Sequence, residues 1–256
     1  EAGSEGWTVT APTRRFDLAI EEDLVEEIAR IHGYDAVPTT LPGGSTRLVA
    51  PSEGQVPEHD LRRALAGRGY LEAINYAFID AALLQRWQAD EALVPLANPL
   101  SAELGVMRPR LLPGLVDALA RNAARQQDRV RLFELGKVFS ATLAGEAPRE
   151  TPRIAAVASG EAAAEQWGTA ARRVDFHDLK GDLEALAALS RARLEFRAAA
   201  PSWAHPGRAA EVLRDGEVVG AIAELHPRLQ QVLGLDHPVV AFELDLAALT
   251  TRGLPK

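Results

Sequence analysis

A succession of strand-like segments in the second half of the chain constrains the fold more than any other feature. Apolar patterns predict strands over 130–140, 153–160, 193–198, 218–225 and 239–246. The Asp-Gly pair within 214–217 predicts a hairpin turn. Because strands follow one another without strict alternation with helices, the sequence predicts an α+β fold with a mostly antiparallel sheet.

Helical periodicity and turn residues place the remaining elements. A strand is expected over 7–10, and "YLEAINYAFI" predicts another over 70–79. Gly33 is expected to end the first helix. Pro227 is expected to start a helix of two turns. Helices are also predicted over 20–32, 58–69, 80–88, 113–128 and 175–190.

Composition excludes several classes of protein. Of 256 residues, 47% are apolar and 25% charged, which is typical of a globular protein that buries a full core. No run of eighteen apolar residues predicts a membrane span, and no secretory leader is visible. The absence of cysteine excludes disulfides and agrees with a cytosolic origin. Glu1 as the first residue and Met107 as the only methionine suggest a piece of a longer protein.

The negative charge is concentrated near the start of the chain. Residues 1–60 hold twelve acidic and four basic residues, whereas the rest holds 24 of each. On the helix predicted over 20–32, Asp23, Glu26 and Glu27 share one face, and Asp17 precedes that helix. Four carboxylates without thiols or imidazoles suit a hard cation such as Mg²⁺ or Ca²⁺. The alternative is a solvated face that complements the helix dipole.

A basic cluster follows in the middle of the chain. Arg121, Arg125 and Arg129 are spaced four apart and would form one stripe of the helix predicted over 113–128. Such a stripe could contact an RNA backbone or the acidic surface of a partner subunit. The alternative is again a solvated face, neutralised by nearby acids.

Common catalytic and nucleotide-binding motifs are absent from the sequence. It contains no GxxxxGK[ST] loop, GxGxxG, GxSxG or HExxH. His205, His226 and His237 each precede proline, and their spacing matches no metal signature. No catalytic residue is therefore assigned.

Several segments resemble one known family in the family's own order. "APTRRFDLAIEEDLVEEIARIHGYDAVP" is similar to the small metal-binding domain of the bacterial phenylalanyl-tRNA synthetase beta subunit. "LANPLSAELGVMRPRLLPGLVDALARN", "RLFELGKVF" and "FELDL" resemble the catalytic-like core of that subunit. The resemblance implies a class II synthetase-like antiparallel sheet with flanking helices over 58–250. It also implies a linker over 42–57 and part of a small α/β, winged-helix-like domain over 1–41.

The resemblance also implies a function and partners. Members belong to a cytoplasmic ligase of two alpha and two beta subunits, which uses ATP and Mg²⁺ to attach phenylalanine to its tRNA. The family's metal ligands correspond to Asp17, Asp23, Glu26 and Glu27. ATP is expected to bind the alpha subunit rather than this chain.

One departure from active synthetases sets the expected role. Active members carry an Arg-x-Glu strand motif whose arginine grips the ATP phosphates. This chain offers Arg131 and Glu134, three apart, and strand side chains three apart point to opposite faces. The chain is therefore expected to be a non-catalytic module that supports the alpha subunit.

Two other classes of function stay open at this point. A DNA-binding or generic interaction module with a carboxylate metal site would use the arginine stripe, although the acidity of residues 1–60 argues against it. A metal-dependent hydrolase would need an activated water. The sequence offers no histidine near the carboxylates that would support such a metal and its water.

Overall fold

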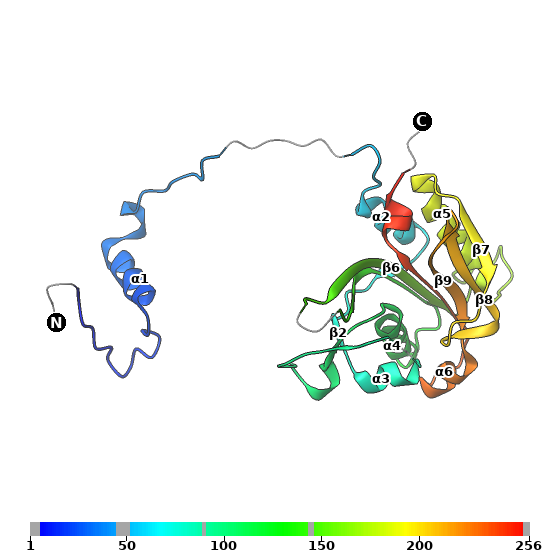
Figure 1. Cartoon of the computed structure of the whole chain (residues 1–256), viewed down its shortest axis with the longest axis horizontal. Helices are drawn as coiled ribbons and strands as arrows, with labels where there is room; N and C mark the ends of the chain where they lie inside the picture. The colour runs from blue at the N-terminus through cyan, green and yellow to red at the C-terminus, as the bar shows by residue number, and fades with distance from the viewer. Residues whose placement is uncertain (1–5, 45–51, 89–90, 143–145, 253–256) are drawn as a thin grey trace. The chain divides into compact units, whose positions relative to one another are not determined.

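The computed structural model describes residues 6–44, 52–88, 91–142 and 146–252. The chain forms two compact units, Glu1–Ala50 and Pro51–Lys256, each considered by itself (Figure 1). Residues 45–51 of the expected linker over 42–57 lie outside the described residues. Within the described ranges, no helix is long and apolar enough to cross a membrane.

The first unit is built on one helix, α1 (Glu21–His32), followed by a short 3₁₀ helix, η1 (Tyr34–Ala36). Gly33 ends α1 with a φ of 96°, in the region that favours glycine. The strand expected over 7–10 is wrong: residues 8–10 take no regular structure. No residue of α1 is buried, and Ile28 and Ile31 of its apolar stripe are 69% and 77% exposed.

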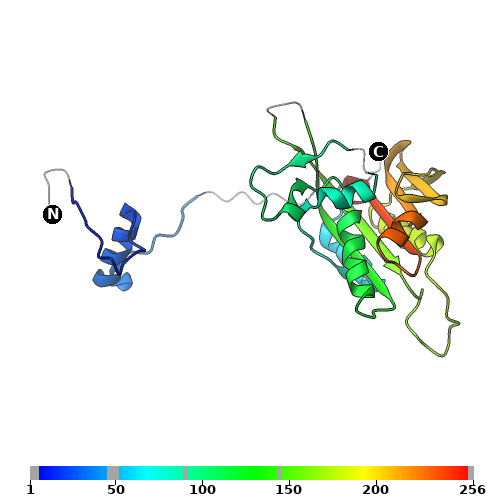
Figure 2. The ribbon, with the colours of Figure 1, turned by 90° about the horizontal axis from the view of Figure 1, so that it is seen from below.

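The second unit contains a seven-stranded sheet in the order β1-β5-β6-β10-β9-β8-β7 (Figures 1 and 2). All neighbouring strands are antiparallel except β1 and β5, which are parallel. The strands are β1 (Leu71–Glu72), β5 (Val130–Ser140), β6 (Arg149–Ser159), β7 (Leu194–Ala198), β8 (Ala204–Arg214), β9 (Glu217–Leu225) and β10 (Val239–Asp245). A smaller sheet in the order β2-β4-β3 comprises β2 (Phe78–Ile79), β3 (Val94–Pro95) and β4 (Val106–Met107).

Helices cover both faces of the large sheet. The helices of the second unit are α2 (Glu58–Gly67), α3 (Ala81–Arg86), α4 (Leu112–Ala123), α5 (Phe176–Ser190), α6 (Pro227–Val232) and α7 (Ala247–Thr250), and the 3₁₀ helix η2 (Ala102–Leu104) contacts β2 of the smaller sheet. Figures 1 and 2 show α4 and α5 on opposite sides of the sheet. We call these sides the α4 face and the α5 face.

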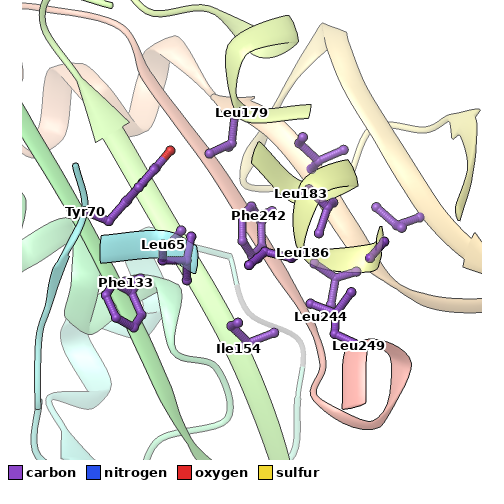
Figure 3. Close-up of a cluster of buried hydrophobic side chains, with 14 of the residues drawn as sticks. Leu65, Tyr70, Phe133, Ile154, Leu179, Leu183, Leu186, Phe242, Leu244 and Leu249 are labelled. Atoms are coloured by element: carbon purple, nitrogen blue, oxygen red, sulfur yellow. The ribbon is translucent and has the colours of Figure 1, made fainter. Parts of the chain in front are cut away.

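Alternating side chains of each strand supply two separate cores. On the α5 face, Phe133, Ile154 and Phe242 pack against leucines of α2, α5 and α7 (Figure 3). On the α4 face, Leu132 and Ala241 pack against α4 and α6. This burial on both faces is the main apolar contribution to the stability of the unit.

The structure confirms the predicted α+β fold with flanking helices and corrects two details of the predicted sheet. The large sheet is mixed rather than wholly antiparallel, because β1 runs parallel to β5. The single strand expected over 70–79 is divided into β1 and β2, which belong to different sheets. Asp215 and Gly216 both have positive φ, as the predicted hairpin turn requires.

Candidate functional site

Two arginine side chains lie among the acidic residues of the first unit. Arg15 Nη2 lies 2.7 Å from Asp17 Oδ2 and 2.7 Å from Glu27 Oε1. Arg30 donates to the second oxygen of Glu27 at 2.6 Å. The hydrogen bond from Arg15, followed by that from Arg30, lowers the pKa of Glu27 to about 2. Two of the four predicted metal ligands therefore already share a cation.

The other two predicted ligands have different surroundings. Asp23 Oδ2 accepts the backbone N–H groups of Ala19 and Ile20 at 2.7 and 2.9 Å, and these bonds lower its pKa. It therefore caps the start of α1. Glu26 is exposed. Over the described ranges, no group of three or more His, Cys, Asp or Glu side chains is gathered closely enough to hold a metal ion in this arrangement.

The predicted arginine stripe of the second unit does not form. Helix α4 ends at Ala123, so Arg125 and Arg129 lie beyond it and only Arg121 belongs to it. Arg121 pairs with Asp117 at 2.9 Å. Arg129 is half-buried, and burial followed by the charge of Arg131 lowers its pKa. The three arginines therefore do not present one continuous basic face.

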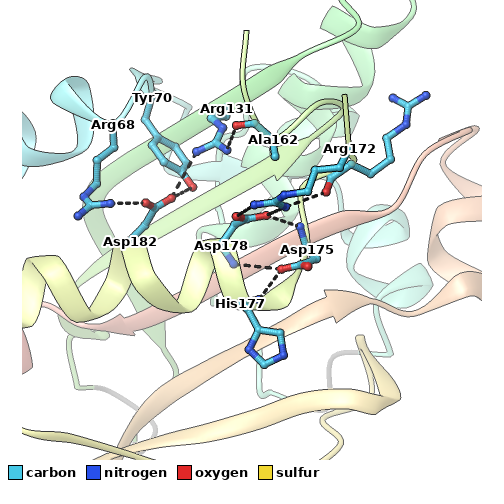
Figure 4. Close-up of polar contacts among 10 residues, drawn as sticks. Arg68, Tyr70, Arg131, Ala162, Arg172, Asp175, His177, Asp178 and Asp182 are labelled. Atoms are coloured by element: carbon cyan, nitrogen blue, oxygen red, sulfur yellow. Dashed lines mark hydrogen bonds and ion pairs between the residues drawn. The ribbon is translucent and has the colours of Figure 1, made fainter. Parts of the chain in front are cut away.

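Arg131 lies on the α5 face within a buried polar network (Figure 4). Asp182 of α5 accepts hydrogen bonds from Arg68 and from the hydroxyl of Tyr70, both at 2.8 Å. Arg131 Nη1 lies 3.4 Å from Asp182 Oδ2, and its Nη2 donates to the carbonyl of Ala162 at 2.9 Å. Burial and the charge of Asp182 raise the pKa of Tyr70. Arg131 thus contacts α5 through Asp182 and the segment after β6 through Ala162, while its Nε has no hydrogen-bond partner among the described residues.

Glu134 lies on the opposite α4 face. Its Oε1 accepts a hydrogen bond of 2.6 Å from Arg108, and its Oε2 accepts one of 2.7 Å from Asn75. The side chains of Arg108 and Glu134 are 8% and 4% exposed. Gly136 makes room for the pair, because a Cβ at this position would overlap Arg108 Nη2.

These positions determine what the strand β5 can do. Arg131 and Glu134 point to opposite faces, as the spacing predicts, and each is bound to other residues of the chain. An arginine that grips a triphosphate must present its donors to an open face. Strand β5 therefore carries one buried polar network on each of its faces.

Sequence reasoning missed the partners of these residues. Asp182 is one acid among several on α5, and Arg15 precedes α1 by six residues. Asp182 contacts residues more than fifty positions away, and Arg15 contacts Glu27 twelve positions away, so local spacing does not reveal these contacts. A sequence signal exists only for Asp182, which lies three residues after Leu179 and four before Leu186, on the apolar face of α5.

Similar solved structures identify the class of fold. A pyrrolysyl-tRNA synthetase from Desulfitobacterium hafniense superposes with a TM-score of 0.54 at 17% identity, covering 75% of this chain and 66% of that one. A second structure, PylSc from the same organism, gives 0.51 at 18% identity and covers 75% and 64%. The second unit thus has the fold of a class II tRNA synthetase.

Sequence comparisons identify the family. The profile of the phenylalanyl tRNA synthetase beta chain CLM domain matches residues 37–246, and that of the tRNA synthetase B5 domain matches residues 1–34. The phenylalanine–tRNA ligase beta subunit of Xanthomonas campestris pv. campestris (strain 8004) is 62% identical over this whole chain. That of Xylella fastidiosa (strain Temecula1) is 57% identical over 99% of it. The chain spans 32% of the length of each relative. It belongs to the phenylalanine–tRNA ligase beta subunit family.

Proposed function

We propose that this chain is a non-catalytic part of a cytoplasmic phenylalanine–tRNA ligase and that it supports a catalytic alpha subunit. The complete enzyme would contain two alpha and two beta subunits and use ATP and Mg²⁺ to attach phenylalanine to tRNA. The observation that carries the proposal is the division of Arg131 and Glu134 between opposite faces of β5, each bound within the chain. This arrangement leaves adenylate formation to the partner subunit.

The first prediction concerns activity. The 256-residue chain alone should show no ATP–pyrophosphate exchange with phenylalanine above a protein-free control, because β5 offers no phosphate clamp. Complete enzyme with both subunits serves as the positive control. Exchange by the chain without the alpha subunit, in a preparation shown by mass spectrometry to lack alpha, would contradict the proposal.

The edge of the large sheet offers a surface for the alpha subunit. Leu71, Ile74 and Tyr76 are 71%, 94% and 69% exposed. We call these residues the β1 strip. Within the described residues β1 pairs with β5 alone, so its outer edge is free. Exposed apolar side chains beside a free strand edge favour docking of another chain.

The second prediction tests the β1 strip. Ile74→Glu in a full-length beta subunit should reduce co-purification of tagged alpha at least roughly tenfold, because a charge would be buried in the interface. Val232→Glu on α6, where the native side chain is 50% exposed, is the matched control and should retain alpha. Alpha bound to the Ile74→Glu subunit at the wild-type ratio would exclude this surface.

The arginines of the basic cluster have unequal access to such a partner. Arg121 and Arg125 are exposed, whereas Arg129 turns toward the polar network around Arg131. We therefore propose that Arg121 and Arg125 contact RNA or the alpha subunit and that Arg129 contributes less.

The four carboxylates of the first unit remain our proposed Mg²⁺ ligands. For a metal to bind there, Arg15 would have to leave Asp17 and Glu27, since it occupies the space between them. Binding would then be a competition between the guanidinium and Mg²⁺.

The third prediction follows from this competition. In a Mg²⁺ titration followed by carboxylate NMR, Arg15→Ala should bind Mg²⁺ roughly fivefold or more tightly than the wild type, because the competing cation is gone. The double variant Asp23→Ala/Glu26→Ala should lose the binding. Arg14→Ala, one residue away and outside the ion pairs described, is the matched control. Equal Mg²⁺ binding by all these chains would leave the carboxylates as a solvated face paired with arginine.

A further inference from the structure

A cavity of about 420 Å³ lies on the α4 face, separate from the polar networks around Arg131 and Glu134. Strands β5, β6, β8, β9 and β10 and the segment before α4 contribute to its lining. Glu243 and Asp245 of β10 and Arg153 of β6 form its polar part, while Val138, Trp203 and Ala221 are among its apolar residues. The volume is in the range of small-molecule sites.

Glu243 is the buried group around which this cavity is built. The residue is 5% exposed. Its Oε2 accepts the backbone N–H groups of Leu111 and Leu112 at 3.1 Å each, at the start of α4. Its Oε1 has no hydrogen-bond partner in the described part of the chain, and Arg153 Nη1 lies 3.8 Å away, too far for a hydrogen bond. Oε2 thus accepts hydrogen bonds from the start of α4, and Oε1 is free to accept hydrogen bonds from a ligand.

Hydrogen-bonding capacity around the cavity is unbalanced. Among the described residues, two buried acceptor atoms of the lining have neither a hydrogen bond nor a close ion pair, Glu243 Oε1 and Glu91 Oε2, and a third, Asp245 Oδ1, has only its ion pair with Arg153. Arg153 Nε is the matching donor without a partner in the same lining. Buried polar atoms in folded proteins are nearly always hydrogen-bonded to protein, water or ligand, so a ligand that is mainly a donor would complete this set.

The net charge of the cavity lining also favours a cationic donor. Arg153 lies between two carboxylates, with its Nη2 3.0 Å from Asp245 Oδ1. Two carboxylates and one guanidinium leave a formal charge of −1. Glu91 is paired with Arg110, and Glu211, which also lines the cavity, is paired with Arg197, so neither changes this balance. An ammonium group presents three donors, no acceptor and one positive charge, and so matches both the charge and the missing hydrogen bonds.

We propose that this cavity binds a small primary amine with an apolar body. The ammonium would donate to Glu243 Oε1 and Asp245 Oδ1, and the body would pack against Trp203 and Val138. Burial raises the pKa of the free Glu243 carboxyl, and a bound cation would favour its ionised form. This site would exist in the chain whether or not the role beside an alpha subunit is correct.

Benzylamine and benzyl alcohol, which are close in shape, provide the test on the 256-residue chain. We expect benzylamine to bind roughly tenfold or more tightly than benzyl alcohol, because only the amine presents a charged donor. The readout is ¹⁵N chemical-shift titration, with the amides of Leu111 and Leu112 moving because they share the Glu243 carboxylate. Glu243→Gln should reduce the amine affinity roughly tenfold, because it removes the negative charge of the carboxylate. It also replaces one of the two acceptor oxygens by an N–H donor.

Controls separate binding from folding. Glu184→Gln on the exposed side of α5 makes the same chemical change elsewhere and should bind benzylamine like the wild type. If Glu243→Gln does not fold, Asp245→Asn replaces it, since that side chain is 39% exposed. Equal affinity for amine and alcohol, or full amine affinity in a folded Glu243→Gln or Asp245→Asn chain, would overturn the proposal.

Discussion

Replacing Asp182 by alanine is expected to lower the free energy of unfolding of the Pro51–Lys256 unit by about 3–5 kcal/mol. Asp182 is the acceptor shared by Arg68, Tyr70 and Arg131. Its removal leaves the guanidinium of Arg131 and the hydroxyl of Tyr70 buried without this partner. An uncompensated buried charge costs far more than an exposed ion pair gains.

Guanidinium-induced unfolding followed by circular dichroism measures this effect. Glu184→Ala is the matched control: it lies on the same helix and pairs with Lys180 on the exposed side, and should change stability by less than about 0.5 kcal/mol. Asp182→Asn keeps an acceptor and should fall between the two. A change below about 1 kcal/mol for Asp182→Ala would show that the network in Figure 4 contributes little to stability.

Replacing Glu134 by alanine should cost a similar amount, about 3–5 kcal/mol, on the opposite face of the sheet. The variant leaves the buried guanidinium of Arg108 without its ion-pair partner. Arg108 is 6% exposed and keeps only a hydrogen bond of 2.9 Å to the carbonyl of Lys137. Asn75 also loses its acceptor. The same denaturant experiment reports the change.

A second variant distinguishes charge burial from packing at this site. In Arg108→Met/Glu134→Leu both charges are gone, so most of the stability lost in Glu134→Ala should return. Glu150→Ala on β6, an exposed partner of Lys137, is the control and should be nearly neutral. If the double variant were less stable than Glu134→Ala, the ion pair itself would be a net source of stability.

Strongly patterned elements of the fold could be predicted from the sequence. Strand β5 has the predicted bounds, 130–140, because its residues are apolar on both faces of a covered sheet. Helix α5 carries its predicted apolar face, with Leu179, Leu183 and Leu186 buried. Local pattern was sufficient where burial itself produces the pattern.

Elements that depend on local backbone geometry could not be predicted in this way. The sequence predicts that helix α4 reaches Asp128, but it ends at Ala123. Three residues further on, Gln126 has a positive φ of 63°, which a continuing helix does not allow. No glycine marks this stop. The stripe predicted for Arg121, Arg125 and Arg129 is absent for the same reason, because residues four apart share one face only on a continuous helix.

The candidate sites show the same limit. The spacing of Asp23 and Glu27 is correct for one helix face, but their partners are backbone groups and arginines that spacing does not reveal. Glu243 cannot be recognised from the sequence, because a single glutamate in an apolar strand carries no motif. Its position against the start of α4 depends on tertiary packing over 131 residues of chain.

The role of the chain is tested most directly in the complete enzyme with an inactivated alpha subunit. Wild-type full-length beta would be assembled with an alpha subunit whose ATP-gripping arginine is replaced by alanine, and ATP–pyrophosphate exchange with phenylalanine would be measured. We expect assembly of normal size and no exchange above background, because Arg131 and Glu134 are bound within the beta chain on opposite faces. Exchange that persists in this assembly would place adenylate chemistry on the beta chain and contradict its non-catalytic role.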